Sequence, residues 1–193
     1  MNESLWALPA DELLSRTASA DPTPGGGSVA AIAGALGIGL MQMALAVTAD
    51  PALDEQARRF AELRDAVVPA ADGDVADFTE LMAAYRLPRG DDAERETRAA
   101  AIEHASIAAT ERPLGLVGTL ADAVALSREV EHLVKPGVAS DVLAGRDLAL
   151  GAARAGIRTA DINIAQLDRL GAAATTALRA RRNTLIAQLE DAS

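Results

Sequence analysis

Several residue types that build common functional sites are scarce or absent in this chain of 193 residues. It contains no cysteine, which excludes disulfides, thiolate zinc sites and thiol catalysis. Its two histidines, His104 and His132, are too few for a multi-histidine site. Each stands among charged residues in a helical pattern, and we expect neither to be catalytic. The sequence therefore predicts no metal site.

Positive charge is also scarce. Lys135 is the single lysine, and 28 acidic residues against 18 basic ones give a net charge of −10. Nucleic acids and anionic membranes bind dense basic surfaces, so we expect neither as a partner. An anionic small molecule would have to be attracted locally, by a few arginines or by a helix N-terminus. No basic presequence or cleavage site precedes the first helical pattern, and we expect a cytoplasmic protein.

Aromatic side chains are few: Trp6, Phe60, Phe78 and Tyr85 are the complete set. Half of the residues are nevertheless hydrophobic, so Ala, Leu, Val and Ile must form the core. Alanine is the best helix former, whereas a β-sandwich is built from β-branched and aromatic residues. The sequence predicts an all-α fold in one domain that spans residues 1–193.

The segment from Gly25 to Ala49 contains no charged side chain. It exceeds the ~20 residues that a bilayer requires, but Ala, Gly and Ser dominate it and it carries Gln42. We interpret it as a long central helix buried in a core, whose small residues permit close approach of neighbouring helices. A chain this small cannot cover such a helix on every side, which predicts a homodimer.

The remaining chain is divided by helix breakers, and no strand-like alternation of useful length occurs. Long helices joined by short loops favour an antiparallel multi-helix bundle. We expect Leu13 and Leu14 to face inward from the first helix, and a bend or break near Pro69 and at Pro113. The predicted helices span residues 10–17, 28–47, 52–85, 91–110, 113–133, 140–155 and 161–190.

The most distinctive motif is the glycine turn, which consists of Pro24, Gly25, Gly26, Gly27 and Ser28. Ser28 suits the N-cap of the following helix, and three successive glycines exceed what a turn needs. Backbone N–H groups and the helix dipole would converge there on an anion or an electron-rich oxygen. A plain tight turn is the alternative. The motif is not a Walker loop, because no Gly-Lys-Ser/Thr follows it.

A second candidate begins at Asp74, which leads the apolar residues Phe78, Leu81 and Tyr85 on one helix face. An acid at the head of such a stripe is a candidate proton carrier, and a solvated surface position is the alternative. Asp77 is expected to point to solvent.

Two further pairs of residues are candidates for binding. Arg86 and Arg89 could pair with a substrate carboxylate, although cations at a helix C-terminus are also ordinary dipole partners. Ser140 and Asp141 have side chains typical of a helix N-cap, which is the favoured interpretation, and a ligand contact is the alternative.

The stretch from Asp21 to Gly37 resembles the opening of the formiminotransferase-cyclodeaminase C-terminal family, which includes bacterial methenyltetrahydrofolate cyclohydrolases. The specific part is the proline-triglycine-serine stretch followed by a small-residue helix. The resemblance covers roughly Leu5 to Leu167. Weaker matches follow in order at Asp74 with Phe78, Ala84 to Pro88, Pro113-Leu114, Ser140-Asp141 and Ile162-Asn163-Ile164. A second asparagine of the family is replaced around Thr159.

The resemblance implies an all-helical homodimer that binds a tetrahydrofolate-type small molecule, with no cofactor beyond that substrate. The implied reaction is hydrolysis of 5,10-methenyltetrahydrofolate to 10-formyltetrahydrofolate. Formiminotetrahydrofolate cyclodeaminase is the first alternative, and a noncatalytic folate-type binding or scaffold protein is the second. The resemblance implies that Asp74 is the general acid/base and that Tyr85 orients the reacting centre. The glycine turn with Ser28 would receive the pterin or its linker, and Arg86 and Arg89 the glutamate tail.

Overall fold

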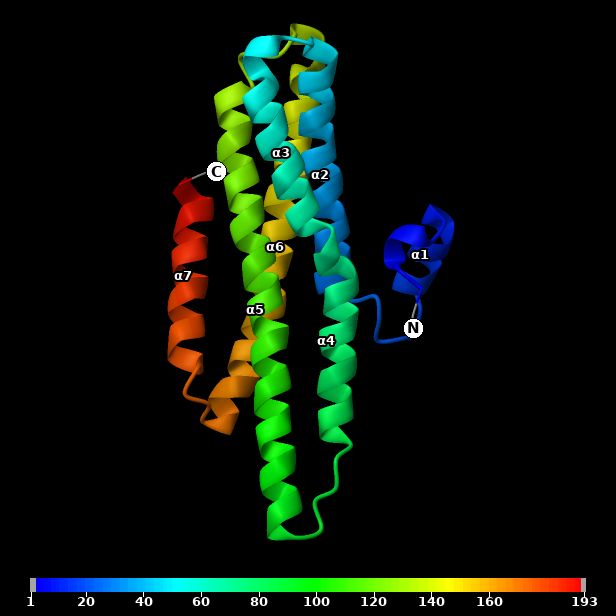
Figure 1. Ribbon diagram of the computed structural model, residues 1–193, viewed down its shortest axis with the longest axis vertical. Coiled ribbons are helices and arrows are strands. Elements are labelled where there is room, and N and C mark those ends of the chain that lie inside the picture. Colours follow the sequence, from blue (N-terminus) through cyan, green and yellow to red (C-terminus); the bar gives the residue numbers. More distant parts are fainter. Residues whose placement is uncertain (1–2, 192–193) are drawn as a thin grey trace.

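The computed structural model describes residues 3–191, which form a bundle of helices without a strand among them (Figure 1). Consecutive long helices run in opposite directions, except that α4 continues the course of α3. The predicted all-α fold is confirmed. The helices are α1 (Ala10–Thr17), α2 (Gly26–Thr48), α3 (Asp54–Val67), α4 (Pro69–Tyr85), α5 (Asp92–Val130), α6 (Ala139–Leu170) and α7 (Thr175–Asp191), with short 3-10 helices at Leu5–Ala7, Pro51–Leu53 and Pro136–Val138.

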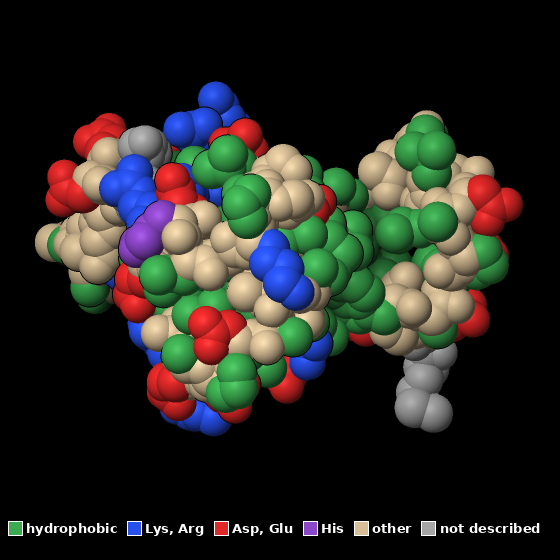
Figure 2. Space-filling model, turned by 90° about the horizontal axis from the view of Figure 1, so that it is seen from above, with side chains coloured by type: hydrophobic (Ala, Val, Ile, Leu, Met, Phe, Trp, Pro, Cys, Tyr) green, Lys and Arg blue, Asp and Glu red, His purple; other side chains and the backbone are tan. Residues whose placement is uncertain are grey.

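The N-terminal segment stands beside the bundle as a separate lobe, with hydrophobic side chains at the junction (Figures 1 and 2). Hydrogen bonds attach it to the start of α4: the Ser4 hydroxyl donates to Asp72 Oδ2 at 2.6 Å, and Trp6 Nε1 donates to the Val68 carbonyl at 2.9 Å. The expectation that Leu14 faces inward is wrong. Leu14 is 69% exposed, because α1 packs on the bundle along only one narrow side and buries no residue fully.

The charge-free helix α2 is the core helix of the bundle and packs mainly against α6. A β-carbon at Gly37 would stand 2.6 Å from the carbonyl oxygen of Gly145, so the two backbones approach more closely than larger residues allow. By length and composition alone α2 could cross a membrane, but 56% of its apolar window is buried within the chain. The predicted close approach of small residues is confirmed.

Two predicted helix caps are wrong. Gly25 is the N-cap of α2, so Ser28 lies inside the first turn instead of preceding it. Val138 is the N-cap of α6, and Ser140 and Asp141 likewise lie inside the first turn without a side-chain cap. The helix α2 starts earlier than predicted because Gly25 adopts the extended conformation of an N-cap, and α6 does so because the 3-10 helix Pro136–Val138 leads directly into it.

The predicted breaks are only partly confirmed. Pro69 starts α4 directly after α3, as expected from the bend assigned there. Pro113, by contrast, lies inside the continuous helix α5 and is buried. The predicted helix over residues 161–190 is divided, because Gly171 adopts a left-handed conformation with φ 68° and ends α6.

Candidate functional site

The glycine turn faces a cavity of about 160 Å³ that is enclosed by the start of α2 and by α4, α5 and α6. The turn therefore does more than connect α1 to α2. The cavity wall comprises Pro22 and Thr23 just before the turn, Gly25, Gly26 and Gly27 of the turn, Asp74, Asp77, Phe78 and Leu81 of α4, Ala109 of α5, and Thr159 and Asn163 of α6. Of the other two residues of the turn, Pro24 lines a neighbouring groove and Ser28 is buried.

Asp74 points at the glycine turn, as the assignment of a proton carrier requires. Its Oδ2 accepts two hydrogen bonds from Ser28, from the backbone N–H at 2.9 Å and from the hydroxyl at 2.8 Å. The carboxylate thus caps α2 from a different helix, where negative charge is favourable. No hydrogen bond within residues 3–191 occupies Oδ1, which leaves that oxygen free to contact a ligand.

Gly27 is required for this arrangement. A β-carbon at this position would stand 2.6 Å from Asp74 Cγ and closer still to Oδ1. The two bonds from Ser28 hold the carboxylate in place, so it cannot move aside freely. One of the three successive glycines is therefore explained by the approach of Asp74.

The expectation that Asp77 points to solvent is wrong. Asp77 is 8% exposed and forms an ion pair with Arg112 of α5, whose Nη2 donates to Asp77 Oδ1 at 2.9 Å while Nε donates to Oδ2. Gly73 makes room for the guanidinium, because a β-carbon there would stand 2.5 Å from Arg112 Cζ. The pKa of Arg112 is raised, first by its hydrogen bonds to Asp77 and then by the negative charges of Asp77, Asp74 and Glu80.

The α6 wall of the cavity presents hydrogen-bond acceptors. The Thr159 hydroxyl donates to the Ala155 carbonyl at 3.3 Å, and Asn163 Nδ2 donates to the Ala109 carbonyl at 2.6 Å. The Thr159 hydroxyl hydrogen and one of the two amide hydrogens of Asn163 are thereby used within the chain. Their oxygen atoms, together with Asp74 Oδ1, form a cavity lining that favours a ligand with N–H or O–H donors or with positive charge.

Tyr85 lies outside the cavity. It shares a helix face with Asp74, but eleven residues along α4 place it about 16 Å away. There it packs beside Ala84 and Ile102, and the Arg98 guanidinium stands 5.9 Å from the centre of its ring. Within one chain, the structure does not bring Tyr85 to the atoms around Asp74.

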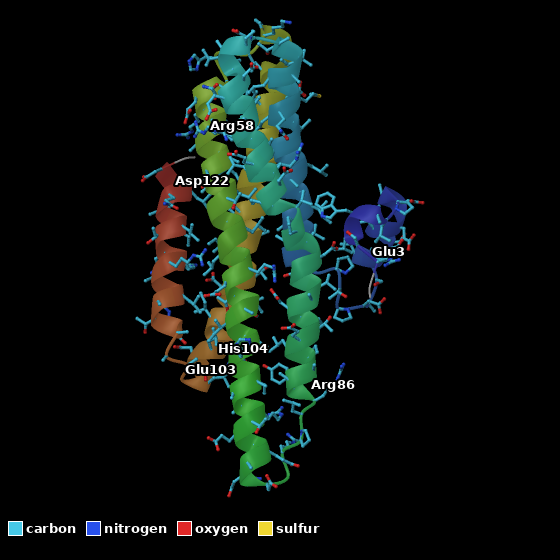
Figure 3. All side chains as sticks on the ribbon, viewed as in Figure 1. Glu3, Arg58, Arg86, Glu103, His104 and Asp122 are labelled. Atoms are coloured by element: carbon cyan, nitrogen blue, oxygen red, sulfur yellow. The ribbon has the colours of Figure 1, made fainter. Side chains whose placement is uncertain are left out.

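Arg86 and Arg89 follow at the end of the same helix, where both are exposed. Figure 3 shows Arg86 directed away from the bundle. Neither arginine lines the cavity, and both are open to solvent.

Ser140 and Asp141 lie at the opposite end of the bundle. They start α6, and about 30 Å of helix separates them from Thr159. Lys135, just before them, donates its backbone N–H to the Thr48 hydroxyl at the far end of α2. A single chain therefore does not bring this pair to the glycine turn.

A larger groove of about 860 Å³ lies between the N-terminal segment and α4, and Thr23 lines both the groove and the cavity. Among the described residues that line it, three are acidic, Glu3, Asp72 and Glu80, and one is basic, Arg16. Arg16 is paired with Glu12. The groove therefore disfavours an anionic ligand.

No group of three or more metal-ligating side chains is found in residues 3–191. His104 and His132 are exposed on the surface of the bundle.

Sequence reasoning missed the Asp77–Arg112 pair. The two residues are 35 positions apart on different helices, and the sequence offers no spacing that would connect them. It also gave no reason to link Asn163 with Ala109, which lie 54 positions apart.

Comparison with known proteins points to one group. The model of the formiminotransferase-cyclodeaminase family matches residues 9–182. The chain is 33% identical over 162 residues to a methenyltetrahydrofolate cyclohydrolase of Methylorubrum extorquens, an alignment that covers 80% of this chain and 76% of the relative. Its fold matches the crystal structure of a formiminotetrahydrofolate cyclodeaminase from Thermotoga maritima with a TM-score of 0.81, at 20% identity, over 98% of this chain and 93% of the other.

Proposed function

We propose that this protein, which belongs to the formiminotransferase-cyclodeaminase family, is an enzyme of folate one-carbon metabolism that hydrolyses 5,10-methenyltetrahydrofolate to 10-formyltetrahydrofolate. The observation that carries the proposal is the carboxylate of Asp74. It is held by Ser28 at the N-terminus of α2, with one oxygen open to the cavity. The relative that is 33% identical is named for this reaction.

Asp74 serves as general base and then as general acid. Its Oδ1 takes a proton from a water molecule as the water oxygen bonds to the methenyl carbon, which gives a tetrahedral carbon between N5 and N10. The same proton passes to N5 as the bond between carbon and N5 breaks, and the hydroxyl proton leaves to solvent as the formyl group forms on N10. A positioned carboxyl group contributes about 10²–10⁴-fold to such a step.

The cavity chemistry suits this substrate. The bridge of 5,10-methenyltetrahydrofolate carries a positive charge that is shared between N5, carbon and N10. Acceptor oxygens from Asp74, Thr159 and Asn163 complement that charge. The Asp77 carboxylate is paired with Arg112, whereas no ion pair within residues 3–191 engages the Asp74 carboxylate on the cavity wall.

The rest of the substrate extends along α4. The cavity is smaller than the ~300–1,000 Å³ of typical ligand pockets, so it accommodates only the reacting end. Tyr85 then borders the aminobenzoyl portion, and Arg86 and Arg89 attract the glutamate tail. The acidic lining of the larger groove makes it a poor site for the negatively charged glutamate tail.

The protein acts as a homodimer through the outward face of α2. Four large hydrophobic side chains are exposed there at helical spacing, namely Val29, Leu36, Met43 and Val47. Such a contiguous apolar stripe on a soluble protein typically marks an interaction surface. Charged residues are absent from the whole helix, which favours an identical apolar partner.

An antiparallel pairing of two α2 helices also gives Ser140 and Asp141 a role. Their end of α6 lies beside Thr48. In an antiparallel dimer, that end meets the glycine turn of the second copy. Each cavity would then receive Ser140 and Asp141 from the other protomer.

We include in the proposal that the enzyme needs no cofactor beyond the tetrahydrofolate substrate. We likewise propose a cytoplasmic location without nucleic-acid or membrane partners. The grounds are the net charge of −10 and the single lysine.

The test is a spectrophotometric assay of 5,10-methenyltetrahydrofolate decay, run beside 5-formiminotetrahydrofolate with ammonia detection. We expect decay of the methenyl compound well above its spontaneous rate. Ammonia release alone would identify a cyclodeaminase instead. No acceleration in either assay would contradict an enzymatic function and leave a binding or scaffold role.

A further inference from the structure

A proline, a carbonyl group and an asparagine meet at one point of the cavity wall. Pro113 lies inside α5 and has no N–H, so the regular helix hydrogen bond to the carbonyl of Ala109 cannot form. Asn163 of α6 supplies the missing donor, because its Nδ2 lies 2.6 Å from the Ala109 oxygen. Both Ala109 and Asn163 line the cavity.

This bond fixes which end of the Asn163 amide faces the ligand. A carbonyl oxygen only accepts hydrogen bonds, so the NH₂ group must point toward Ala109. A flipped amide would bring two oxygen atoms together and leave the partly buried carbonyl of Ala109 without a donor, which costs free energy. Asn163 Oδ1 therefore remains on the side of the amide away from α5, and no hydrogen bond within residues 3–191 occupies it.

We propose that Asn163 is a substrate-binding residue of fixed polarity, whose Oδ1 accepts a hydrogen bond from an N–H or O–H donor of the bound tetrahydrofolate compound. The inference rests on the proposed function, since it places the reacting end of a folate in this cavity. Pro113 contributes by exposing the carbonyl that holds the amide. The competing explanation is purely structural, in which Asn163 only satisfies Ala109.

Two substitutions separate these explanations. Asn163→Leu removes the acceptor at nearly constant volume, and it also leaves the Ala109 carbonyl without its donor. Pro113→Ala restores a helix N–H to that carbonyl, so the structural need for Asn163 disappears. The double variant Pro113→Ala/Asn163→Leu then reports on the ligand contact alone, with Pro113→Ala as its reference.

The readouts are the dissociation constant for 5-formyltetrahydrofolate, a stable folate, measured by calorimetry, and the thermal midpoint. We expect the double variant to bind about tenfold or more weakly than Pro113→Ala, in keeping with one lost hydrogen bond in a polar cavity. We also expect its thermal midpoint to exceed that of Asn163→Leu. Equal affinity of the double variant and Pro113→Ala would overturn the inference and leave a structural role for Asn163.

The same measurements keep this inference apart from the proposed reaction. A wild-type protein that binds 5-formyltetrahydrofolate but does not hydrolyse the methenyl compound would contradict the cyclohydrolase activity, and the comparison of the variants would still decide the role of Asn163. A wild-type protein that neither binds nor turns over a folate would overturn both.

Discussion

The carboxylate of Asp74 occupies the space beside Gly27 that a β-carbon would need, with Cγ 2.6 Å from that position. The close approach links two helices, because Asp74 lies on α4 and caps α2 through Ser28. The sequence motif of three glycines and the candidate proton carrier are therefore parts of one structure.

Gly27→Ala is expected to displace Asp74. The added methyl group must push away a carboxylate that two hydrogen bonds hold, at a cost of about 1–3 kcal/mol in the free energy of unfolding. Turnover of methenyltetrahydrofolate should also fall, because Asp74 is displaced. Urea denaturation and the decay assay measure both effects. Gly115→Ala on α5 is the matched control, because its β-carbon meets only Arg181 Nη2 at 3.9 Å, and it should stabilise the helix slightly. Equal behaviour of the two variants would contradict the assigned role of Gly27.

Arg112→Ala is expected to destabilise the protein by leaving the buried Asp77 without its partner. Breaking a fully buried pair costs about 3–5 kcal/mol, and we expect about 1–3 kcal/mol because the side chain of Arg112 is 37% exposed. Urea denaturation at pH 7 measures the loss. Arg58→Ala is the control, since Arg58 pairs with Glu55 and Glu62 on the open surface of α3, and its midpoint should hardly change. A midpoint for Arg112→Ala as high as that of the control would show that the pair contributes nothing.

Acidification should weaken the contact between the end of α5 and α6. The hydrogen bond from Arg146 holds the pKa of Glu131 below its ordinary value of 4.5. A depressed carboxyl pKa stabilises the fold above the ordinary value, and this contribution disappears as the pH falls through the pKa of the folded state. Urea midpoints between pH 6 and 3 should therefore fall less steeply in Glu131→Gln than in the wild type. Arg146→Ala should flatten the curve in the same way, and unchanged slopes in both variants would exclude this contribution.

Leu36→Asp is expected to produce a monomer. Leu36 is 59% exposed at the middle of the apolar stripe of α2, where a charge would face its own copy across the proposed interface. Sedimentation equilibrium measures the mass, and turnover should fall as well if the second protomer supplies Ser140 and Asp141. Leu14→Asp is the control, because Leu14 is exposed on α1, away from that stripe. A wild-type monomer, or a dimeric Leu36→Asp protein, would contradict the proposed interface.

The fold was predictable because local signals decide it. Low aromatic content, abundant alanine and the charge-free segment all favour helices, and Pro69 breaks the chain where expected. The misplaced boundaries have a common cause. Pro113 remains inside α5 because contacts from neighbouring helices outweigh its local effect, and Gly171 ends a helix that periodicity alone would continue.

The candidate site was only half predictable. Asp74 and the glycine turn were chosen independently from the sequence, and the structure brings them together. A shared helix face, in contrast, says nothing about distance along the helix, so Tyr85 was placed too near Asp74. Contacts between distant helices, such as those of Asp77 and Asn163, depend on packing that no local pattern encodes.

The central claim is that Asp74 transfers the proton during hydrolysis of 5,10-methenyltetrahydrofolate. The most direct measurement is kcat for Asp74→Asn beside Asp72→Asn, an acid of the same helix that binds Ser4 and lines the neighbouring groove. We expect kcat of Asp74→Asn to fall about 10²–10⁴-fold while the protein remains folded and binds 5-formyltetrahydrofolate, and kcat of Asp72→Asn to stay near the wild-type value. Wild-type turnover by Asp74→Asn would contradict the claim.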